Sequence, residues 1–211
     1  MKVTLVDLND SLTSAAKSLR WNDIELRPYT DIKAIVPEPG MAFVSPANSL
    51  GFMDGGIDLV YSRIMFPGIE SRLKMAIKQN GLTSILGRPY LPIGQALVLP
   101  TQHEKVYFIA APTMWLPQDV SMTHNAYHAM YAVLEAATKN KEIHHIILCG
   151  LCTGYGKTSP KVAIEHMYQA YQDHVNKSTS RFAPDEIIAE QPNIYMNTEF
   201  KEIYAHEVLD I

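Results

Sequence analysis

Apolar and polar positions along the chain follow two alternating patterns, which predict strands and helices in turn. KVTLVDL (residues 2–8) predicts a buried strand, and NDSLTSAAKSLRW (9–21) has the polar start and apolar spacing of a helix. MAFVSPA (41–47) predicts a second strand that ends in a loop rich in Pro, Asn and Gly, and GIDLVYSRIM (56–65) continues as a helix. The chain therefore opens with repeated strand and helix units.

The same alternation continues through the second half of the chain. GQALVLPT (94–101) and VYFIAAPT (106–113) predict neighbouring strands, and MTHNAYHAMYAVLEAATKN (122–140) predicts a helix with an apolar face. IHHIILC (143–149) is a nearly continuous apolar strand. SPKVAIEHMYQAYQDHV (159–175) predicts a helix, with its Ser as the cap and its Pro at the first helical position.

This order of elements predicts an α/β fold, in which a sheet carries helices on both faces. In such sheets ligands bind beyond the carboxyl ends of the strands. A chain of 211 residues is long enough for one sizeable domain, which we place at residues 1–177. Residues 178–211 are irregular, and we expect them to form a C-terminal extension packed on the same domain, with a short helix near 198–209.

Composition and charge narrow the class of protein. Hydrophobic residues make up 47% and charged residues 19% of the chain, as in a folded globular protein. A net charge of -4 disfavours a nucleic-acid surface, because phosphate binding needs clustered Lys and Arg. The start of the chain lacks the basic residues of a signal peptide, and no run of about 18 apolar residues is present. With two cysteines and no disulfide scaffold, we expect a cytoplasmic protein that binds neither nucleic acid nor membrane.

The stretch LCGLCTGYGKTS (148–159) carries three signatures that imply different chemistry. A redox Cys-x-x-Cys needs its first thiol at a helix N-terminus, whereas Cys149 ends a predicted strand and is more simply a small buried residue. A Walker phosphate loop needs Gly-x-x-x-x-Gly-Lys, and Gly150 lies one residue too far from the Gly-Lys pair. We favour the third interpretation, in which glycines between a strand and a helix N-terminus offer backbone N–H groups to an anion.

A second stretch of the same kind is VSPANSLGFMDGGIDLVYS (44–62), which also runs from a strand through a glycine-rich loop into a helix. Two such cradles suit a diphosphate. The Pro-Ala-Asn at the strand end, followed by Gly51, Gly55 and Gly56 and then Ile-Asp, resembles the macrodomain family of ADP-ribose-binding modules. The family's motif there is Asn-Ala-Ala-Asn, a glycine run, Val-Asp and a helix.

The resemblance covers most of the chain, from about residue 24 to about residue 175. DIKAI (31–35), GQALVLPT (94–101), NAYHAMYAVLEAA (125–137) and GLCTGYG (150–156) resemble further family segments, in the family's order. It implies the three-layer fold of a macrodomain, with a mixed sheet and helices on both faces.

The resemblance also implies roles for particular residues. Asp31 would accept a hydrogen bond from the adenine amino group, or it is an ordinary turn carboxylate. Asn48 matches the family's last Asn, which contacts the distal ribose, although an Asx-type turn is as common a role. Asp58, ten residues later, matches the general base of the hydrolytic branches, or it is a carboxylate favoured by the helix N-terminus. Asn48 and Asp58 are therefore the candidate catalytic residues. The candidate ligand-binding residues are Asp31, Ile32, Ala47, Asn48, Gly55, Gly56, Ile57, Cys152, Thr153, Gly154, Tyr155 and Gly156.

The first of the two stretches departs from the family pattern. Ser45 and Pro46 stand where the first Asn and an Ala are usual, and Phe52, Met53 and Asp54 interrupt the glycine run. The resemblance implies a module that binds ADP-ribose or a derivative and hydrolyses ADP-ribose from proteins, or ADP-ribose 1″-phosphate, without metal or cofactor. Its partner would be ADP-ribose or an ADP-ribosylated protein. The departures motivate the alternatives of a non-catalytic reader of ADP-ribose or another nucleotide, and of a site for a different ligand.

Overall fold

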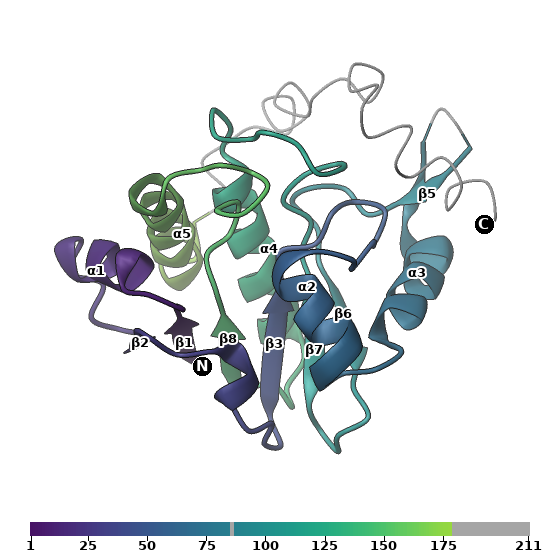
Figure 1. The fold of residues 1–211 in the computed structure, drawn as a ribbon, viewed down its shortest axis with the longest axis horizontal. Coiled ribbons are helices and arrows are strands. Elements are labelled where there is room, and N and C mark those ends of the chain that lie inside the picture. Colours follow the sequence, from purple (N-terminus) through teal and green to yellow (C-terminus); the bar gives the residue numbers. More distant parts are fainter. Residues whose placement is uncertain (85–86, 179–211) are drawn as a thin grey trace.

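A six-stranded sheet runs through the middle of the molecule in the order β2-β1-β8-β3-β7-β6 (Figure 1). The computed structural model describes residues 1–84 and 87–178. Neighbours from β2 to β7 pair in parallel, and β6 pairs antiparallel with β7. The strands are β1 (Lys2–Val6), β2 (Glu25–Arg27), β3 (Met41–Ser45), β6 (Leu97–Pro100), β7 (Tyr107–Ala110) and β8 (His145–Leu148).

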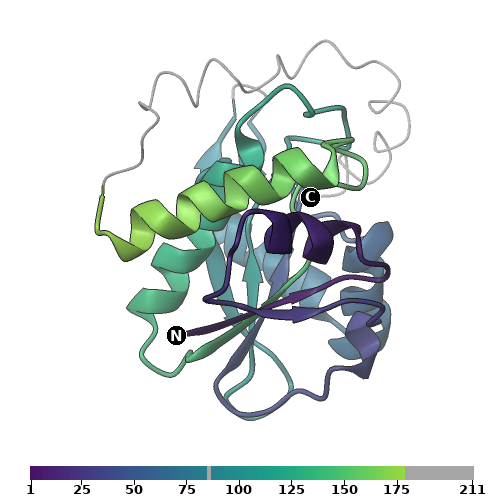
Figure 2. The same cartoon turned by 90° about the vertical axis from the view of Figure 1, so that its left-hand side faces the viewer.

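Helices cover both faces of the sheet, which gives three layers (Figures 1 and 2). One face carries α1 (Ser11–Ser18), α4 (Asn125–Lys139) and α5 (Pro160–Val175). The other carries α2 (Gly56–Val60), its π-helical continuation η2 (Tyr61–Met65) and α3 (Ile69–Asn80). A 3-10 turn, η1 (Ile32–Ala34), leads towards β3, and a small separate sheet pairs β4 (Leu82–Thr83) with β5 (Pro89–Tyr90).

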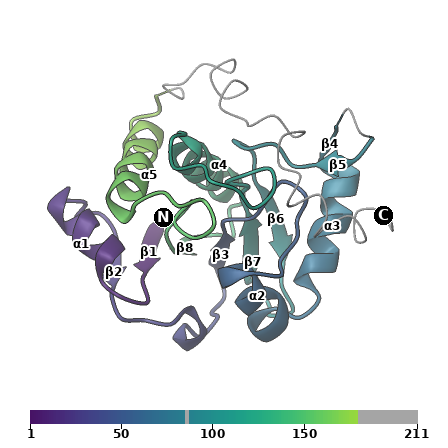
Figure 3. The ribbon, with the colours of Figure 1, turned by 45° about the horizontal axis from the view of Figure 1, so that its top comes forward.

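Each central strand supplies both hydrophobic cores, because successive strand residues point to opposite faces. Ala42 and Val44 of β3 pack in the core beneath α1, α4 and α5, whereas Phe43 packs in the core beneath α2 and α3. The pairing of β1 with β8 sets Leu5 opposite Leu148. Since β1, β8 and β3 run in the same direction, their carboxyl ends and the loops that follow them lie together at one edge (Figure 3).

The structure confirms the predicted α/β fold with helices on both faces. Ser159 caps α5 as expected, since its hydroxyl oxygen accepts a hydrogen bond from the Val162 N–H. The sequence analysis did not identify β2, β4, β5 or α3, although the buried residues of α3 recur at helical spacing. The expected C-terminal extension and its helix fall in residues 179–211, outside the described part of the chain. No helix in the described residues is long and apolar enough to cross a membrane.

Trp21 holds the N-terminal unit against α5. Its ring is 1% exposed and lies 5.5 Å from the ring of Tyr168 and 5.4 Å from that of Tyr171, measured between centroids. Trp21→Ala should lower the free energy of unfolding by about 3–5 kcal/mol, because it leaves a cavity beside two aromatic rings. Urea denaturation measures this loss. The control is Met122→Ala, at a side chain that is 94% exposed, where a change of about 0.5 kcal/mol or less is expected. Equal effects of the two variants would contradict this account.

Candidate functional site

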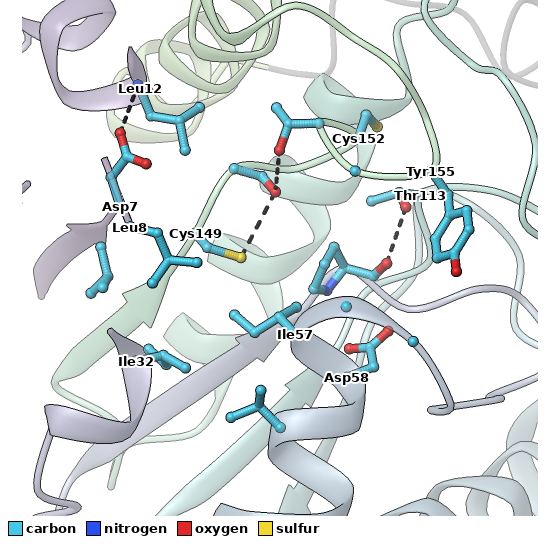
Figure 4. A pocket seen from close by; sticks show the side chains of 18 of the residues that line it. Asp7, Leu8, Leu12, Ile32, Ile57, Asp58, Thr113, Cys149, Cys152 and Tyr155 are labelled. Carbon is cyan, nitrogen blue, oxygen red and sulfur yellow. Dashed lines mark hydrogen bonds between the residues drawn. The ribbon is translucent and has the colours of Figure 1, made fainter. Parts of the chain in front are cut away.

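A cavity of about 790 Å³ opens where β1, β3 and β8 end (Figure 4). Four segments contribute most of its lining: the loop after β1, the η1 turn, the glycine-rich first loop (residues 46–55) after β3, and the second loop (149–158) after β8. A volume in the range of about 300–1,000 Å³ is typical of pockets that hold small ligands.

Asn48 holds the first loop in shape. Its side-chain oxygen accepts hydrogen bonds from the backbone N–H groups of Leu50 (3.1 Å) and Phe52 (3.2 Å), and its amide donates to the Phe52 carbonyl (2.8 Å). The residue is buried and lines the cavity. Asn48 therefore makes the turn that was considered as an alternative role for it, and its amide keeps a second N–H that a ligand can accept.

Asp58 places a weakly acidic carboxyl group in the cavity. It lies in the first turn of α2, half-buried, and its Oδ1 accepts a 2.6 Å hydrogen bond from Ser45 Oγ at the end of β3. Burial raises the pKa of Asp58 to about 7, the hydrogen bond from Ser45 opposes this shift, and the charges of Asp54 and Glu70 add to it. A carboxyl group that titrates near neutral pH is suited to proton transfer.

The two thiols of the second loop also line the cavity (Figure 4). Burial raises the pKa of Cys149 to about 12, and that of Cys152 to about 12 as well, so neither is ionised at neutral pH. Cys149 follows β8 and is half-buried, as a strand-end residue and not a helix N-terminal one. These features disfavour the redox interpretation of the Cys-x-x-Cys.

Lys157 does not take the place of a Walker lysine. It is absent from the cavity lining, and its Nζ lies 3.7 Å from an Asp119 carboxylate oxygen. Its φ of 55° places a non-glycine residue in the left-handed region, just before α5 begins. Lys157 is therefore a charge at the outer side of the second loop.

The two glycine-rich loops meet across the cavity. A Cβ atom on Gly55 would lie 3.0 Å from Cε2 of Tyr155, so the missing side chain lets the tyrosine ring rest against the first loop. Tyr155 is 61% exposed and lines the cavity from the second loop (Figure 4). Behind it, Thr153 Oγ1 donates a 3.3 Å hydrogen bond to the Gly150 carbonyl, which fixes the base of the second loop.

Asp31 and Ile32 bring the η1 turn into the lining. The Asp31 side chain accepts a 3.0 Å hydrogen bond from the Lys33 backbone N–H and forms a 3.0 Å ion pair with Lys33 Nζ. Both interactions hold the pKa of Asp31 below its usual value. Ile32 is 6% exposed and supplies an apolar surface beside this carboxylate. Asp31 is thus both a capping carboxylate and a cavity residue.

The structure brings most of the predicted site residues together. Ala47 and Gly156 are the exceptions: Ala47 packs in the core beneath α3, and the Gly156 carbonyl accepts a 3.0 Å hydrogen bond from the Val120 N–H, so neither lines the cavity. Asp54 and Asp58 both line it, Asp54 as an exposed residue. The other predicted residues in the lining are Asp31, Ile32, Asn48, Gly55, Gly56, Ile57, Cys152, Thr153, Gly154 and Tyr155.

The loop after β1 is a part of the site that the sequence analysis missed. Asp7, Leu8 and Asn9 line the cavity because β1 ends at the same edge as β3 and β8. The Asp7 carboxylate accepts a 2.8 Å hydrogen bond from the Leu12 N–H and so fixes the start of α1. The signal that could have found this loop is the Asp-Leu-Asn-Asp directly after an apolar strand.

The charged side chains in the lining are mainly acidic. Lys33 is the one cationic side chain among the described lining residues, and it is paired with Asp31. An anionic ligand would therefore depend on backbone N–H groups of the two loops. No group of three or more His, Cys, Asp and Glu side chains in residues 1–84 and 87–178 is placed to hold a metal ion.

Comparisons with solved structures identify the fold. No protein-family model and no curated protein matches the chain. The structure resembles the macrodomain of Mycobacterium tuberculosis DarG, with a TM-score of 0.54 and 20% identity over 69% of this chain and 88% of that one. It also resembles an Oceanobacillus iheyensis macrodomain solved with ADPR (TM-score 0.56, 15% identity, 84% of this chain and 91% of that one) and with ADP (TM-score 0.56, 16% identity, 84% and 89%). The chain therefore has the macrodomain fold, as its sequence resemblance predicted.

The raised pKa of Asp58 has a consequence for stability. Its ordinary value is 3.8 and its value in the folded protein is about 7, so the folded state binds the proton more tightly than the unfolded state. Stability is therefore lost as pH rises from about 4 to about 7. Asp58→Asn removes this loss and should raise the free energy of unfolding at pH 8 by on the order of 2 kcal/mol, a value reduced because the carboxyl keeps contact with solvent. At pH 5 the gain should be smaller.

Thermal or urea unfolding at the two pH values measures the effect. Asp119→Asn is the matched control, because Asp119 is exposed and its hydrogen bonds with Ser121 lower its pKa. That variant should not gain stability at high pH. An equal gain for Asp58→Asn at pH 5 and pH 8 would show that Asp58 does not titrate as described.

Proposed function

We propose that the cavity binds ADP-ribose, as free ADP-ribose or as the modification on a protein. The observation that carries this proposal is that both glycine-rich loops of a macrodomain fold face one cavity, with Asp31 on one wall and Asp58 on another. The similar Oceanobacillus iheyensis macrodomain has structures with ADPR and with ADP, which supports the same ligand class here.

The lining residues suggest how such a ligand would be held. The Asp31 carboxylate would accept a hydrogen bond from the adenine amino group, with Ile32 packed against the base. Backbone N–H groups from Gly55 to Ile57 and from Thr153 to Tyr155 would hold the diphosphate from two sides. The distal ribose would then lie beside Asn48 and Asp58.

We further propose that the protein hydrolyses the bond between ADP-ribose and a protein side chain, with Asp58 as general base. A water molecule would attack C1″ of the distal ribose, and the bond from C1″ to the side-chain heteroatom would break. Asp58 would accept one proton from the water, and the released side chain would take up a proton. The pKa of about 7 places this carboxyl near the value that proton transfer requires at neutral pH.

A non-catalytic reader is the second candidate, and one observation favours it. The Asn48 side chain, which would contact the distal ribose, already makes three hydrogen bonds inside the first loop. A reader would bind ADP-ribose and release nothing.

Isothermal titration tests binding. ADP-ribose should bind with micromolar affinity and more tightly than ATP, AMP or NAD. The affinity should change little between about 50 and about 200 mM salt, because backbone groups and not Lys or Arg hold the diphosphate. Asp31→Ala should weaken binding about tenfold or more, the loss of a charge-assisted hydrogen bond. Lys157→Ala is the control and should change the affinity by less than about threefold. Absence of ADP-ribose binding, or its complete loss in Lys157→Ala, would overturn the assignment.

Release of ADP-ribose from a mono-ADP-ribosylated protein tests hydrolysis. Asp58→Ala should lower the turnover rate about 10²–10⁴-fold, the usual contribution of a general base. It should still bind ADP-ribose, because the two loops are unchanged. A wild-type protein that binds ADP-ribose and gives no turnover would be the reader, and an Asp58→Ala protein with wild-type turnover would remove Asp58 from the mechanism.

A further inference from the structure

Ser45 is the residue in this site that departs most from the family pattern, since an Asn is usual at its position. It is the last residue of β3 and is fully buried. Its backbone carbonyl accepts a 3.1 Å hydrogen bond from the Ala111 N–H, which extends the pairing of β3 with β7. The Ser45 side chain therefore projects from one of the most rigid parts of the molecule.

The hydroxyl group of Ser45 contacts a single carboxylate oxygen. Ser45 Oγ donates to Asp58 Oδ1 at 2.6 Å, the short distance of a charge-assisted hydrogen bond. Within the described residues Asp58 Oδ2 makes no hydrogen bond, and Asp58 lines the cavity. One oxygen is thus tied to the sheet while the other stays available.

We propose that Ser45 is the positioning residue of this site: its hydroxyl holds one oxygen of Asp58 so that the other can take a proton from a water molecule or ligand hydroxyl in the cavity. The inference rests on the proposed function for its catalytic consequence. The positioning itself rests on the contact between β3 and α2.

The groups that face Asp58 show why such a partner is needed. Asp54 from the first loop and Glu70 from α3 both disfavour its ionised form. The other two titratable neighbours are the Cys149 thiol and the Tyr61 phenol, whose pKa values burial raises far enough to keep both neutral. Ser45 thus supplies the hydrogen bond that favours the carboxylate against this surrounding.

A hydroxyl also fits the two states that a general base must adopt. The Ser45 hydroxyl can donate to the ionised carboxylate and accept from the protonated one, because it is both donor and acceptor. The nitrogen of an Asn amide can only donate. Ser45 can therefore stay hydrogen-bonded to Asp58 before and after the proton moves.

The direct test is the titration of Asp58 followed by the NMR shift of its carboxyl carbon, in the ligand-free protein. Ser45→Ala should raise the midpoint by about one pH unit or more, as expected for the loss of a hydrogen bond to a charged group. Ser45→Thr keeps the hydroxyl and should restore the wild-type midpoint. Ser45→Cys, which has a weaker donor, should give an intermediate midpoint and serves as a second variant if Ser45→Ala folds poorly.

Thr4→Val is the matched control. Thr4 is buried, and its hydroxyl also donates to a carboxylate, that of Glu25, at 3.1 Å. It lies on β1, which is separated from β3 by β8. The variant removes a comparable buried hydroxyl and should leave the Asp58 midpoint unchanged. An unchanged midpoint in Ser45→Ala, or an equal shift in Thr4→Val, would overturn the proposal.

Turnover adds a second readout. In Ser45→Ala the acid limb of the pH profile of kcat should move upward by the same amount as the NMR midpoint, so that the loss of rate is larger at pH 6 than at pH 9. A pH-independent loss would indicate a purely structural role and would contradict the proposal. If the wild-type protein shows no turnover, the hydrolase assignment fails, and the NMR titration alone decides whether Ser45 positions Asp58.

Discussion

The parallel pairing of β1, β8 and β3 is the constraint on which the site depends. Strands that are buried on both faces are apolar along their length, so polar side chains enter the chain where the strands stop. Asp7 follows β1, Ser45 ends β3 and Cys149 follows β8. Because the three strands run in one direction, these residues and the loops after them meet at one edge, and the cavity forms there.

The cavity combines two electrostatic environments that oppose each other. Backbone N–H groups of glycine-rich loops favour an anion, whereas the nearby carboxylates disfavour one. The structure separates these influences: Asp31 is paired with Lys33, the Asp7 carboxylate is used by the backbone of α1, and Asp58 has a raised pKa. A site of this kind distinguishes ligands by where their charge lies and less by how much charge they carry.

The fold was predictable from the sequence because it depends on local patterns that recur in order. The apolar runs, the cap of α5 and the two glycine-rich loops are all visible within short windows. The parts of the site that were missed depend on distant residues. The contact of Tyr155 with Gly55 joins the two loops across the sheet, and the acidity of Asp58 depends on Glu70 and on burial. Ala47 was predicted as a ligand contact, but it packs into the core while Asn48 beside it lines the cavity, and only the path of the loop decides which of two neighbours does so.

The position of β8 has a consequence for how the protein is made. It is the last strand in the described chain, yet it lies between β1 and β3. Until residues 145–148 leave the ribosome, the β1–β2 pair and the β3–β7–β6 group have no strand to join them, and each presents an open apolar edge. Insertion of β8 closes both edges and brings the three walls of the cavity together in the same step. A nascent or truncated chain that ends before β8 therefore has no partial site, and ligand binding begins only when the sheet is complete.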